Sequence, residues 1–304
     1  MSSVLGGVAV GARTDGYWAT LGFEKASVDF CEPNFESSYY VAEPLNTLSS
    51  VPFILLGLFG LLSANFARGA PLGGWEHAAF VWSYALTAAI GIGSMALHAT
   101  LIAPGQTADE LAMMFMNLLL VFIILELESG TASLLRPWLP RAFGAVGVGT
   151  VAIYARYRAF YTPFLVVYIA SFVCIIIPAC ARLAFKPRKD PLGERARAKI
   201  IRPLFICAIT SAVVPGAVAW VIEFNYCTVV SRVLGPAFLH PIWHSGAQLG
   251  AWLCIQFLSA ARISACGQTP QLRWHWGLPI TVYPPPSPGS PKRPMDRPAE
   301  VGRE

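Results

Sequence analysis

The chain has 304 residues, of which 55% are hydrophobic and only 13% are charged, and its mean hydropathy is +0.54. About a quarter of the residues in a soluble domain are charged. The composition therefore excludes an ordinary soluble domain and predicts an all-α, polytopic membrane protein. We expect the formal net charge of +5 to face anionic lipid headgroups on a cytosolic rim and not to form a nucleic-acid surface.

A helix that spans a membrane needs about 20 mostly apolar residues. Several segments approach this length, so we expect a bundle of seven transmembrane helices, at residues 45–66, 78–97, 110–127, 141–156, 160–183, 203–222 and 240–261. The segment 141–156 is short and rich in glycine, which is also compatible with a re-entrant or tilted element.

The charged residues predict how the chain crosses the membrane. Residues 1–44 are polar, so we expect no cleavable signal peptide. Basic residues accumulate in cytoplasmic loops, and with seven spans the larger basic group falls on the side opposite the N-terminus. We therefore expect a luminal N-terminal segment at 1–44, a helical bundle at 45–262, and a cytosolic tail at 263–304. The tail contains PPPSPGSPKRP, and because proline removes hydrogen-bond donors we expect it to be disordered.

Three of the five histidines stand at the ends of long apolar segments. His240 and His244 are four residues apart, so both rings would leave the same face of a helix. The predicted topology brings them to the same membrane face as His98 and Asp109. Three imidazoles beside a carboxylate suit a catalytic zinc ion, which keeps its fourth position open for water. Interfacial histidines that cap membrane helices are the alternative.

The segment DFCEPNFESSYYVAEPLN, at residues 29–46, is rich in carboxylates and precedes the first apolar segment. Hard oxygen ligands at short spacing suit calcium, but the spacing does not match an EF-hand loop, and a solvated polar leader is the alternative. Cys31 and Cys227 both fall on the predicted luminal side, where a disulfide is chemically favoured. Two free thiols are the alternative to this pairing.

Taken together, these residues resemble the alkaline ceramidase family, within a superfamily of seven-helix, zinc-dependent intramembrane hydrolases that also includes the adiponectin receptors. The resemblance extends over about residues 16–262. It is carried by GYW at 16–18, DFCEPN at 29–34, AEPLN at 42–46, Ser94 four residues before His98, DEL at 109–111, Trp220 with Glu223 and Cys227, and His240 with His244.

The resemblance implies a role for each residue of the expected catalytic site. Zinc would be held by His98, His240 and His244. Asp109 would be the catalytic acid and base, and Ser94 would assist at the substrate oxygen. Glu223 stands where the family commonly has aspartate, and we interpret it as a supporting or structural carboxylate.

The resemblance also implies a calcium site and a disulfide. Calcium would be held by the side chains of Asp29, Glu32, Asn34 and Glu43 and by the backbone carbonyl of Phe30. The implied disulfide joins Cys31 to Cys227. Phe30 stands where the family usually has tryptophan, which leaves the carbonyl intact. Pro44 and Leu45 replace aromatic residues that commonly follow the glutamate.

The implied activity is hydrolysis of the ceramide amide to a sphingoid base and a fatty acid, with phytoceramide or dihydroceramide as further substrates. It would depend on zinc, be regulated by calcium, and act on a lipid in the endoplasmic reticulum or Golgi membrane. One alternative is a seven-helix receptor of the adiponectin-receptor type, which would bind a ligand without obligatory turnover. Another is a lipid-remodelling esterase of the same superfamily. The DFCE segment and the DEL motif favour the ceramidase.

Overall fold

The computed structural model describes residues 16–66, 74–129, 138–157, 159–187, 191–235 and 239–283. Residues 1–15 of the expected luminal segment and residues 284–304 of the expected tail, including its proline-rich stretch, lie outside the described residues. The described part of the chain is mostly helical, as the composition predicts.

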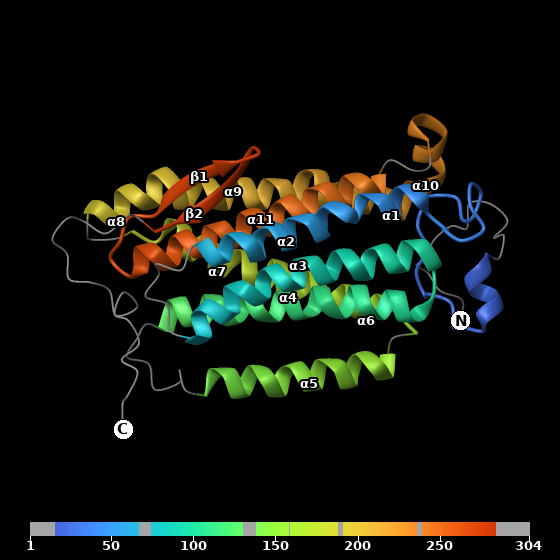
Figure 1. Ribbon diagram of the computed structural model, residues 1–304, viewed down its shortest axis with the longest axis horizontal. Coiled ribbons are helices and arrows are strands. Elements are labelled where there is room, and N and C mark those ends of the chain that lie inside the picture. The colour runs from blue at the N-terminus through green and yellow to red at the C-terminus, as the bar shows by residue number, and fades with distance from the viewer. Residues whose placement is uncertain are drawn as a thin grey trace, which may run out of the picture.

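Long helices run side by side along the long axis of the molecule (Figure 1). In chain order the helical elements are η1 (Tyr17–Leu21), α1 (Pro44–Ser49), α2 (Val51–Phe66), α3 (Gly74–Thr100), α4 (Ala103–Ser129), α5 (Leu139–Tyr157), α6 (Tyr161–Ser171), η2 (Phe172–Ile176), α7 (Ile177–Phe185), α8 (Pro191–Ala196), η3 (Arg197–Ile201), α9 (Arg202–Ser211), η4 (Ala212–Val218), α10 (Ala219–Leu234) and α11 (Leu239–Ala265). The strands β1 (Gln271–His275) and β2 (Leu278–Val282) follow and pair antiparallel.

Proline explains why two of the long helices are interrupted. The segments η2, η3 and η4 are π-helical turns inside otherwise continuous helices. Pro178 and Pro203 follow η2 and η3 closely, and Pro215 lies inside η4. Because proline has no N–H and clashes with the carbonyl four residues earlier, the regular hydrogen-bond ladder cannot pass through it, and a wider turn accommodates it.

By length and composition, five helical stretches in the described ranges could cross a membrane: Pro44–Ser63, Ala78–Thr100, Ala103–Glu128, Tyr161–Phe185 and Gly193–Val233. Each overlaps one of the seven expected spans. The other two expected spans form the helices α5 and α11, which are long but less apolar. Arg141 and Arg156 lie near the ends of α5, and α11 carries Gln248 and Gln256. The count of seven spans therefore remains a prediction.

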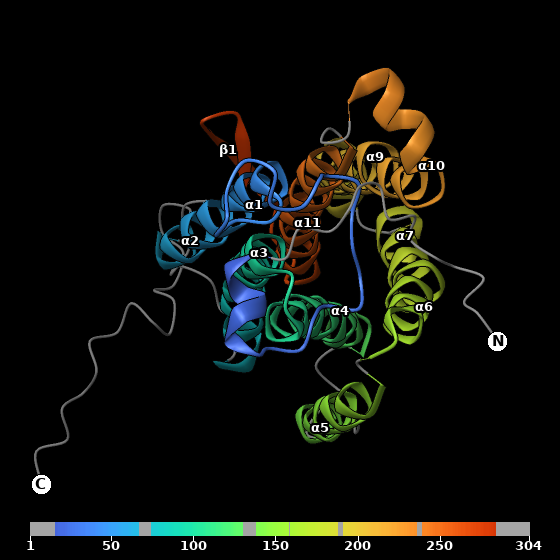
Figure 2. The ribbon, with the colours of Figure 1, turned by 90° about the vertical axis from the view of Figure 1, so that its right-hand side faces the viewer.

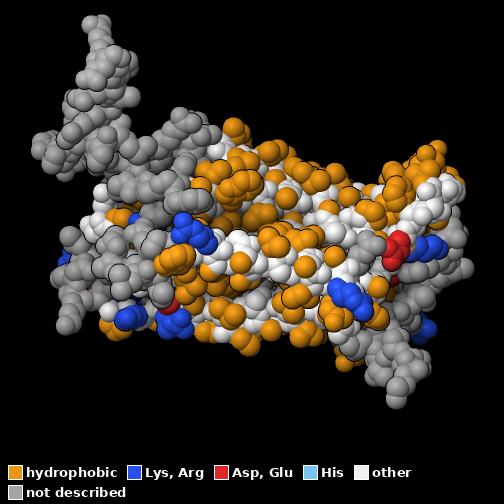
Figure 3. All heavy atoms as spheres, turned by 90° about the horizontal axis from the view of Figure 1, so that it is seen from below, with side chains coloured by type: hydrophobic (Ala, Val, Ile, Leu, Met, Phe, Trp, Pro, Cys, Tyr) orange, Lys and Arg blue, Asp and Glu red, His pale blue; other side chains and the backbone are white. Residues whose placement is uncertain are grey.

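The outer surface agrees with a membrane environment. Figure 3 shows apolar side chains across the middle of one face, with the coloured Lys, Arg, Asp and Glu side chains toward its two ends. The helix α5, about which the sequence was ambiguous, is one uninterrupted helix at the edge of the bundle (Figure 2). Its exposed Val146, Val148 and Ile153 would be stable against lipid tails, which are as apolar as the side chains themselves.

Helix α11 is the centre of the bundle. Figure 2 shows it surrounded by α1, α3, α4 and α9, and its side chains Trp252, Phe257 and Leu258 are buried in the main apolar core. Gly246 lets this helix approach η4, since a Cβ there would lie 2.4 Å from the backbone nitrogen of Gly216. Any larger residue at position 246 would push the helices apart.

The expected disorder of the tail is wrong for residues 263–283. Helix α11 continues to Ala265, and the β1–β2 hairpin then folds back against it. Trp252 Nε1 donates to the Pro279 carbonyl at 3.0 Å, and Thr281 N donates to Gln256 Oε1 at 2.8 Å. The hairpin therefore supplies hydrogen-bond partners to polar groups of α11, which apolar neighbours could not do. The prolines that suggested disorder are concentrated after residue 283.

Candidate metal centre

The three predicted histidines meet inside the bundle. His98 lies in the last turn of α3, and His240 and His244 lie in the first two turns of α11. Their exposed fractions are 1%, 3% and 3%, and one ring nitrogen of each lies within 4.8 Å of the others. Among the described residues, this buried group could bind a metal ion.

Each histidine is oriented by a partner at its Nδ1 atom. Glu43 Oε2 lies 2.5 Å from His98 Nδ1, and Glu223 Oε2 lies 2.7 Å from His240 Nδ1. Ser49 Oγ lies 2.7 Å from His244 Nδ1. The three partners come from the N-terminal segment, α10 and α1, so three separate parts of the chain fix the three rings.

These partners assign the tautomers. A carboxylate only accepts hydrogen bonds, so His98 and His240 carry their proton on Nδ1 and keep a lone pair on Nε2. A metal-binding histidine in proteins commonly shows this arrangement, with its other nitrogen bonded to a carboxylate or carbonyl. The hydrogen-bond pattern thus prepares the Nε2 atoms of these two rings as metal ligands.

Ser94 lies at the histidines, as the sequence predicts. Its hydroxyl oxygen is 3.3 Å from His244 Nε2 and 3.0 Å from Ser50 Oγ. Ser94 is buried, one helical turn before His98 on α3. A hydroxyl in this position can contact a molecule held at the histidines.

Asp109 lies in α4, where α3 approaches closely. A Cβ on Gly93 would lie 2.5 Å from the Asp109 backbone nitrogen, so only glycine allows the two helices this approach beside Ser94. Asp109 Oδ1 is buried, and no hydrogen-bond donor in the described ranges reaches it. A buried polar atom without a partner is costly in a protein interior and is common where a ligand binds. The neighbouring Glu110 differs, because Gln106 and Tyr154 donate to its two oxygens.

The acidic segment before α1 is folded, and its carboxylates have distinct partners. Asp29 Oδ1 accepts from Asn34 Nδ2 at 2.9 Å. The two oxygens of Glu32 accept from the backbone N–H groups of Leu45 and Asn46, each at 2.8 Å. Glu32 therefore caps the N-terminus of α1, where unpaired N–H groups favour a negative charge.

Glu43 belongs to both the acidic segment and the histidine cluster. While its Oε2 faces His98 and Asn46, its Oε1 is buried and meets no donor among the described residues. Burial, followed by the nearby Asp29 carboxylate, raises the pKa of the Glu43 carboxyl well above its ordinary value. A bound cation beside Oε1 would offset this cost and hold the group ionised.

The N-terminal segment is also attached directly over the histidines. The Phe30 ring lies 4.0 Å from the His240 ring and 4.8 Å from the His98 ring, between centroids. Cys31 forms a disulfide with Cys227 of α10, and its backbone nitrogen donates to Glu223 Oε1 at 3.2 Å. The segment therefore covers the three histidines and is covalently fixed beside them.

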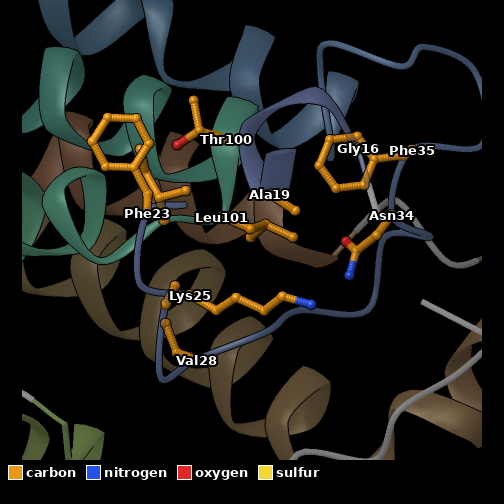
Figure 4. Close-up of a pocket in the computed structure, with 11 residues that line it drawn as sticks. Gly16, Ala19, Phe23, Lys25, Val28, Asn34, Phe35, Thr100 and Leu101 are labelled. Atoms are coloured by element: carbon orange, nitrogen blue, oxygen red, sulfur yellow. The ribbon is translucent and has the colours of Figure 1, made fainter. Parts of the chain in front are cut away.

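A small cavity of about 40 Å³ lies under the same segment, between η1 and the turn from α3 to α4. Figure 4 shows the Lys25 side chain reaching along it toward Asn34, below Leu101. The cavity is large enough for one or two water molecules only, and it is separate from the histidines.

The sequence did not reveal every residue of the centre. Glu43 was expected at calcium only, and Ser49 and Ser50 were not expected at all. Their positions in chain order carry no signal, since Ser49 is 195 residues from His244. Only the three-dimensional packing of α1 against α3 and α11 brings them to the site.

These observations define an integral membrane protein with a buried group of histidines that could bind a metal ion, in a helical bundle. Comparison with known families then gives its family: the Ceramidase family model matches residues 22–285. The chain belongs to the Ceramidase family.

Individual relatives from different eukaryotes agree with the family match. An alkaline ceramidase of Arabidopsis thaliana is 27% identical over 264 residues, which cover 87% of this chain and 94% of the relative. Alkaline ceramidase 1 of Mus musculus is 27% identical over 235 residues, covering 73% and 75%. An alkaline ceramidase of Saccharomyces cerevisiae is 23% identical over 284 residues, covering 86% and 84%. The similarity thus covers at least 73% of this chain and at least 75% of each of these relatives.

Proposed function

We propose that the protein is an alkaline ceramidase, which hydrolyses the amide bond of ceramide, phytoceramide or dihydroceramide to a sphingoid base and a fatty acid. The observation that carries the proposal is the buried group of three histidines, in a chain of the Ceramidase family. The names of its relatives, which are alkaline ceramidases, support the substrate. A ceramidase also explains why the site lies in an apolar bundle, because its substrate is a membrane lipid.

The metal is best assigned as zinc, held by Nε2 of His98, His240 and His244. Three neutral imidazoles with one open position are the donor set of catalytic zinc. The fit is supported by the Nδ1 contacts of these rings with Glu43, Ser49 and Glu223. When bound, zinc would polarise the amide carbonyl and lower the pKa of a water molecule to about 7.

Asp109 and Ser94 supply the remaining chemistry. Asp109 accepts a proton from the attacking water as the water oxygen bonds to the carbonyl carbon. The C–N bond then breaks, and Asp109 returns that proton to the departing nitrogen, so that a carboxylic acid and an amine result. The Ser94 hydroxyl donates a hydrogen bond to the substrate oxygen, whose negative charge grows in the transition state. The unpaired Asp109 Oδ1 supports this role.

Calcium is proposed as a structural and regulatory ion of the N-terminal segment. Its ligands would be the side chains of Asp29, Glu32, Asn34 and Glu43 and the backbone carbonyl of Phe30. Carboxylate and carbonyl oxygens are the ligands that calcium prefers, and the unpaired Glu43 Oε1 supports a cation there. Because Glu43 also orients His98, loss of calcium would disturb the zinc site.

We further propose that α5 and α11 complete a bundle of seven spans at residues 45–262, with a luminal segment at 1–44. The N-terminus would be luminal, the C-terminus cytosolic, and the membrane that of the endoplasmic reticulum or Golgi. The disulfide between Cys31 and Cys227 supports this orientation, since disulfides persist in oxidising compartments.

The decisive experiment is the release of free sphingoid base from a panel of ceramides by purified protein. Activity on ceramide that disappears with a zinc chelator and returns with added zinc is the expected result. A phospholipid ester should not be cleaved at a comparable rate. Preferential cleavage of the ester, or ceramide hydrolysis that persists without bound metal, would overturn the proposal.

A further inference from the structure

Two serines at the end of α1 form a hydrogen-bonded bridge to the metal centre. Ser49 Oγ donates to the Asn46 carbonyl at 2.9 Å, and Ser50 Oγ donates to the same carbonyl at 3.0 Å. From there Ser49 reaches His244, and Ser50 reaches Ser94. Asn46, Ser50 and Ser94 are buried, so water does not compete for the bonds of Ser50, whereas Ser49 is half-buried.

The Ser49 contact fixes how His244 carries its proton. A hydroxyl has one hydrogen to donate, and Ser49 gives it to the Asn46 carbonyl. In that arrangement the Ser49 oxygen accepts from His244 Nδ1 in the contact of 2.7 Å. His244 then keeps its lone pair on Nε2, as His98 and His240 do. Ser49 thus performs for His244 the task that Glu43 and Glu223 perform for the other two rings.

The Ser50 contact controls the hydroxyl of Ser94. While Ser50 donates to Asn46, its oxygen can accept from the Ser94 hydroxyl, which is then turned away from a substrate at the histidines; the other acceptor within reach of Ser94 is His244 Nε2 at 3.3 Å. If the Ser50 hydroxyl rotates and donates to Ser94, the Ser94 proton becomes free to bond the substrate oxygen. The Asn46 carbonyl is not left unpaired by this rotation, because Ser49 still donates to it.

The Asn46 carbonyl, which accepts from both serines of the bridge, is held in place. Glu32 holds the backbone N–H of Asn46, and the Asn46 side chain donates to Glu43 at 3.2 Å. The carbonyl that both serines use is thus anchored to the acidic segment on one side and to α1 on the other. A freely moving carbonyl could not orient two hydroxyl groups at once.

We propose that Ser49 and Ser50 are positioning residues of this enzyme: Ser49 sets the ring and tautomer of His244, and Ser50 sets the direction of the Ser94 hydroxyl. This inference rests on the proposed function, since it takes His244 as a zinc ligand and Ser94 as a donor to the substrate. It adds residues that touch neither the metal nor the substrate.

The first test measures zinc binding. The purified full chain and its Ser49→Ala variant are titrated with Zn²⁺ against a competing chelator, and Co²⁺ is substituted to record the d–d absorption of the site. We expect Ser49→Ala to bind zinc roughly tenfold more weakly and to change the Co²⁺ spectrum, as loss of a partner of a metal-bound histidine does. Ser49→Thr, which keeps the hydroxyl, should restore both. The matched control is Ser245→Ala, because Ser245 is an exposed serine on α11 whose hydroxyl donates to the Pro241 carbonyl of its own helix.

The second test is a double-mutant cycle on Ser50 and Ser94. We expect Ser50→Ala to lower kcat about tenfold, less than the loss of a direct oxyanion donor, with zinc affinity and KM close to those of the parent protein. In a Ser94→Ala background, Ser50→Ala should have almost no further effect, because two residues that act as one unit are not additive. Single-turnover measurements at high enzyme concentration keep the slow double variant measurable.

Several outcomes would overturn the inference. Zinc binding by Ser49→Ala as tight as by Ser245→Ala would remove the role of Ser49. An equal effect of Ser50→Ala with and without Ser94 would show that Ser50 is merely structural. If Ser49→Ala does not accumulate in the membrane, Ser49→Cys keeps the side-chain size but offers only a weak sulfur acceptor, and the same tenfold loss is expected. Absence of zinc binding by the parent protein would instead refute the proposed function itself.

Discussion

The two ends of α11 carry polar residues of opposite character. At the hairpin end, Gln256 has every polar atom paired: Oε1 accepts from Thr281 N, Nε2 donates to Tyr84, and its carbonyl accepts from Thr281 Oγ1. At the histidine end, the Nδ1 atoms of His240 and His244 are bonded, and one ring nitrogen of each of the three histidines lies within 4.8 Å of the others. A saturated polar cluster stabilises the fold, whereas one whose acceptors remain open is prepared for a ligand.

The largest effect is expected from removing one of the three histidines. Replacing His244 with alanine should abolish ceramide hydrolysis, because two imidazoles cannot hold zinc in a catalytic geometry. Release of sphingoid base by purified protein measures activity, and membrane fractionation shows whether the variant is still inserted. Substantial turnover by a well-inserted variant would sink the zinc mechanism. His98→Ala is the independent replicate.

Asp109→Asn should preserve the zinc site and lose the proton transfer. General acid–base catalysis contributes roughly 10²- to 10⁴-fold, so we expect kcat to fall by about that factor while zinc content, measured by atomic absorption, stays at the parent level. Glu110→Gln is the matched control, since that carboxylate is already bonded by Gln106 and Tyr154. A larger loss of kcat in Glu110→Gln than in Asp109→Asn would show that Asp109 is not the catalytic carboxylate.

Glu223→Ala tests whether the partner of a histidine matters as much as we infer. Loss of such a partner typically costs 10- to 100-fold in metal affinity or activity. We therefore expect zinc to dissociate at roughly tenfold lower chelator concentration than from the parent protein. Glu223 also accepts from Cys31 N, so disulfide formation should be checked by gel mobility without reductant. An unchanged zinc affinity in disulfide-bonded protein would contradict the assignment.

Calcium removal should have an intermediate effect. A calcium-selective chelator is expected to lower activity several-fold, because Glu43 would lose the cation that offsets its burial and would orient His98 less well. Glu43→Ala should be less active and no longer respond to calcium. Activity that is indifferent to both treatments would remove the regulatory role of the N-terminal segment.

The smallest effect on activity is expected at the hairpin end. Gln256→Leu leaves the buried Thr281 N–H without its acceptor, which costs about 1–3 kcal/mol. The melting temperature in detergent should fall, while kcat and zinc affinity stay at parent values. A loss of zinc affinity equal to that of Glu223→Ala would show that the two ends of α11 are not independent.

Much of the architecture follows from composition. The apolar segments predicted the long helices, including α5 and α11, because apolar length is the main constraint on a membrane span. The convergence of His98 with His240 and His244 was also accessible, since alternating spans bring these segment ends to one face. By contrast, the β1–β2 hairpin could not be expected from a sequence in which proline dominates the following stretch.

The supporting residues of the centre were hidden for a physical reason. Ser49 and Ser50 resemble ordinary serines near the start of an apolar helix, and their bonds to His244 and Ser94 depend on the angle at which α1 meets α3 and α11. The resemblance to the ceramidase family predicted Glu43 as a calcium ligand, although its shortest contact is with His98. The residue type shows which chemistry a side chain can perform, but the packing angle between the helices decides which group the side chain contacts.

The partners of the three histidines have a consequence for biosynthesis. His244 lies on α11, the last long helix of the described chain, and its supporting serine lies in the first candidate span, Pro44–Ser63. His98 lies on α3, so it meets the other two histidines only after α11 has been inserted. A chain emerging from the ribosome therefore has no complete metal-binding group until its final helix has been inserted and has met α1. Contacts between such distant segments form late in folding, so metal loading itself would report that the bundle has closed.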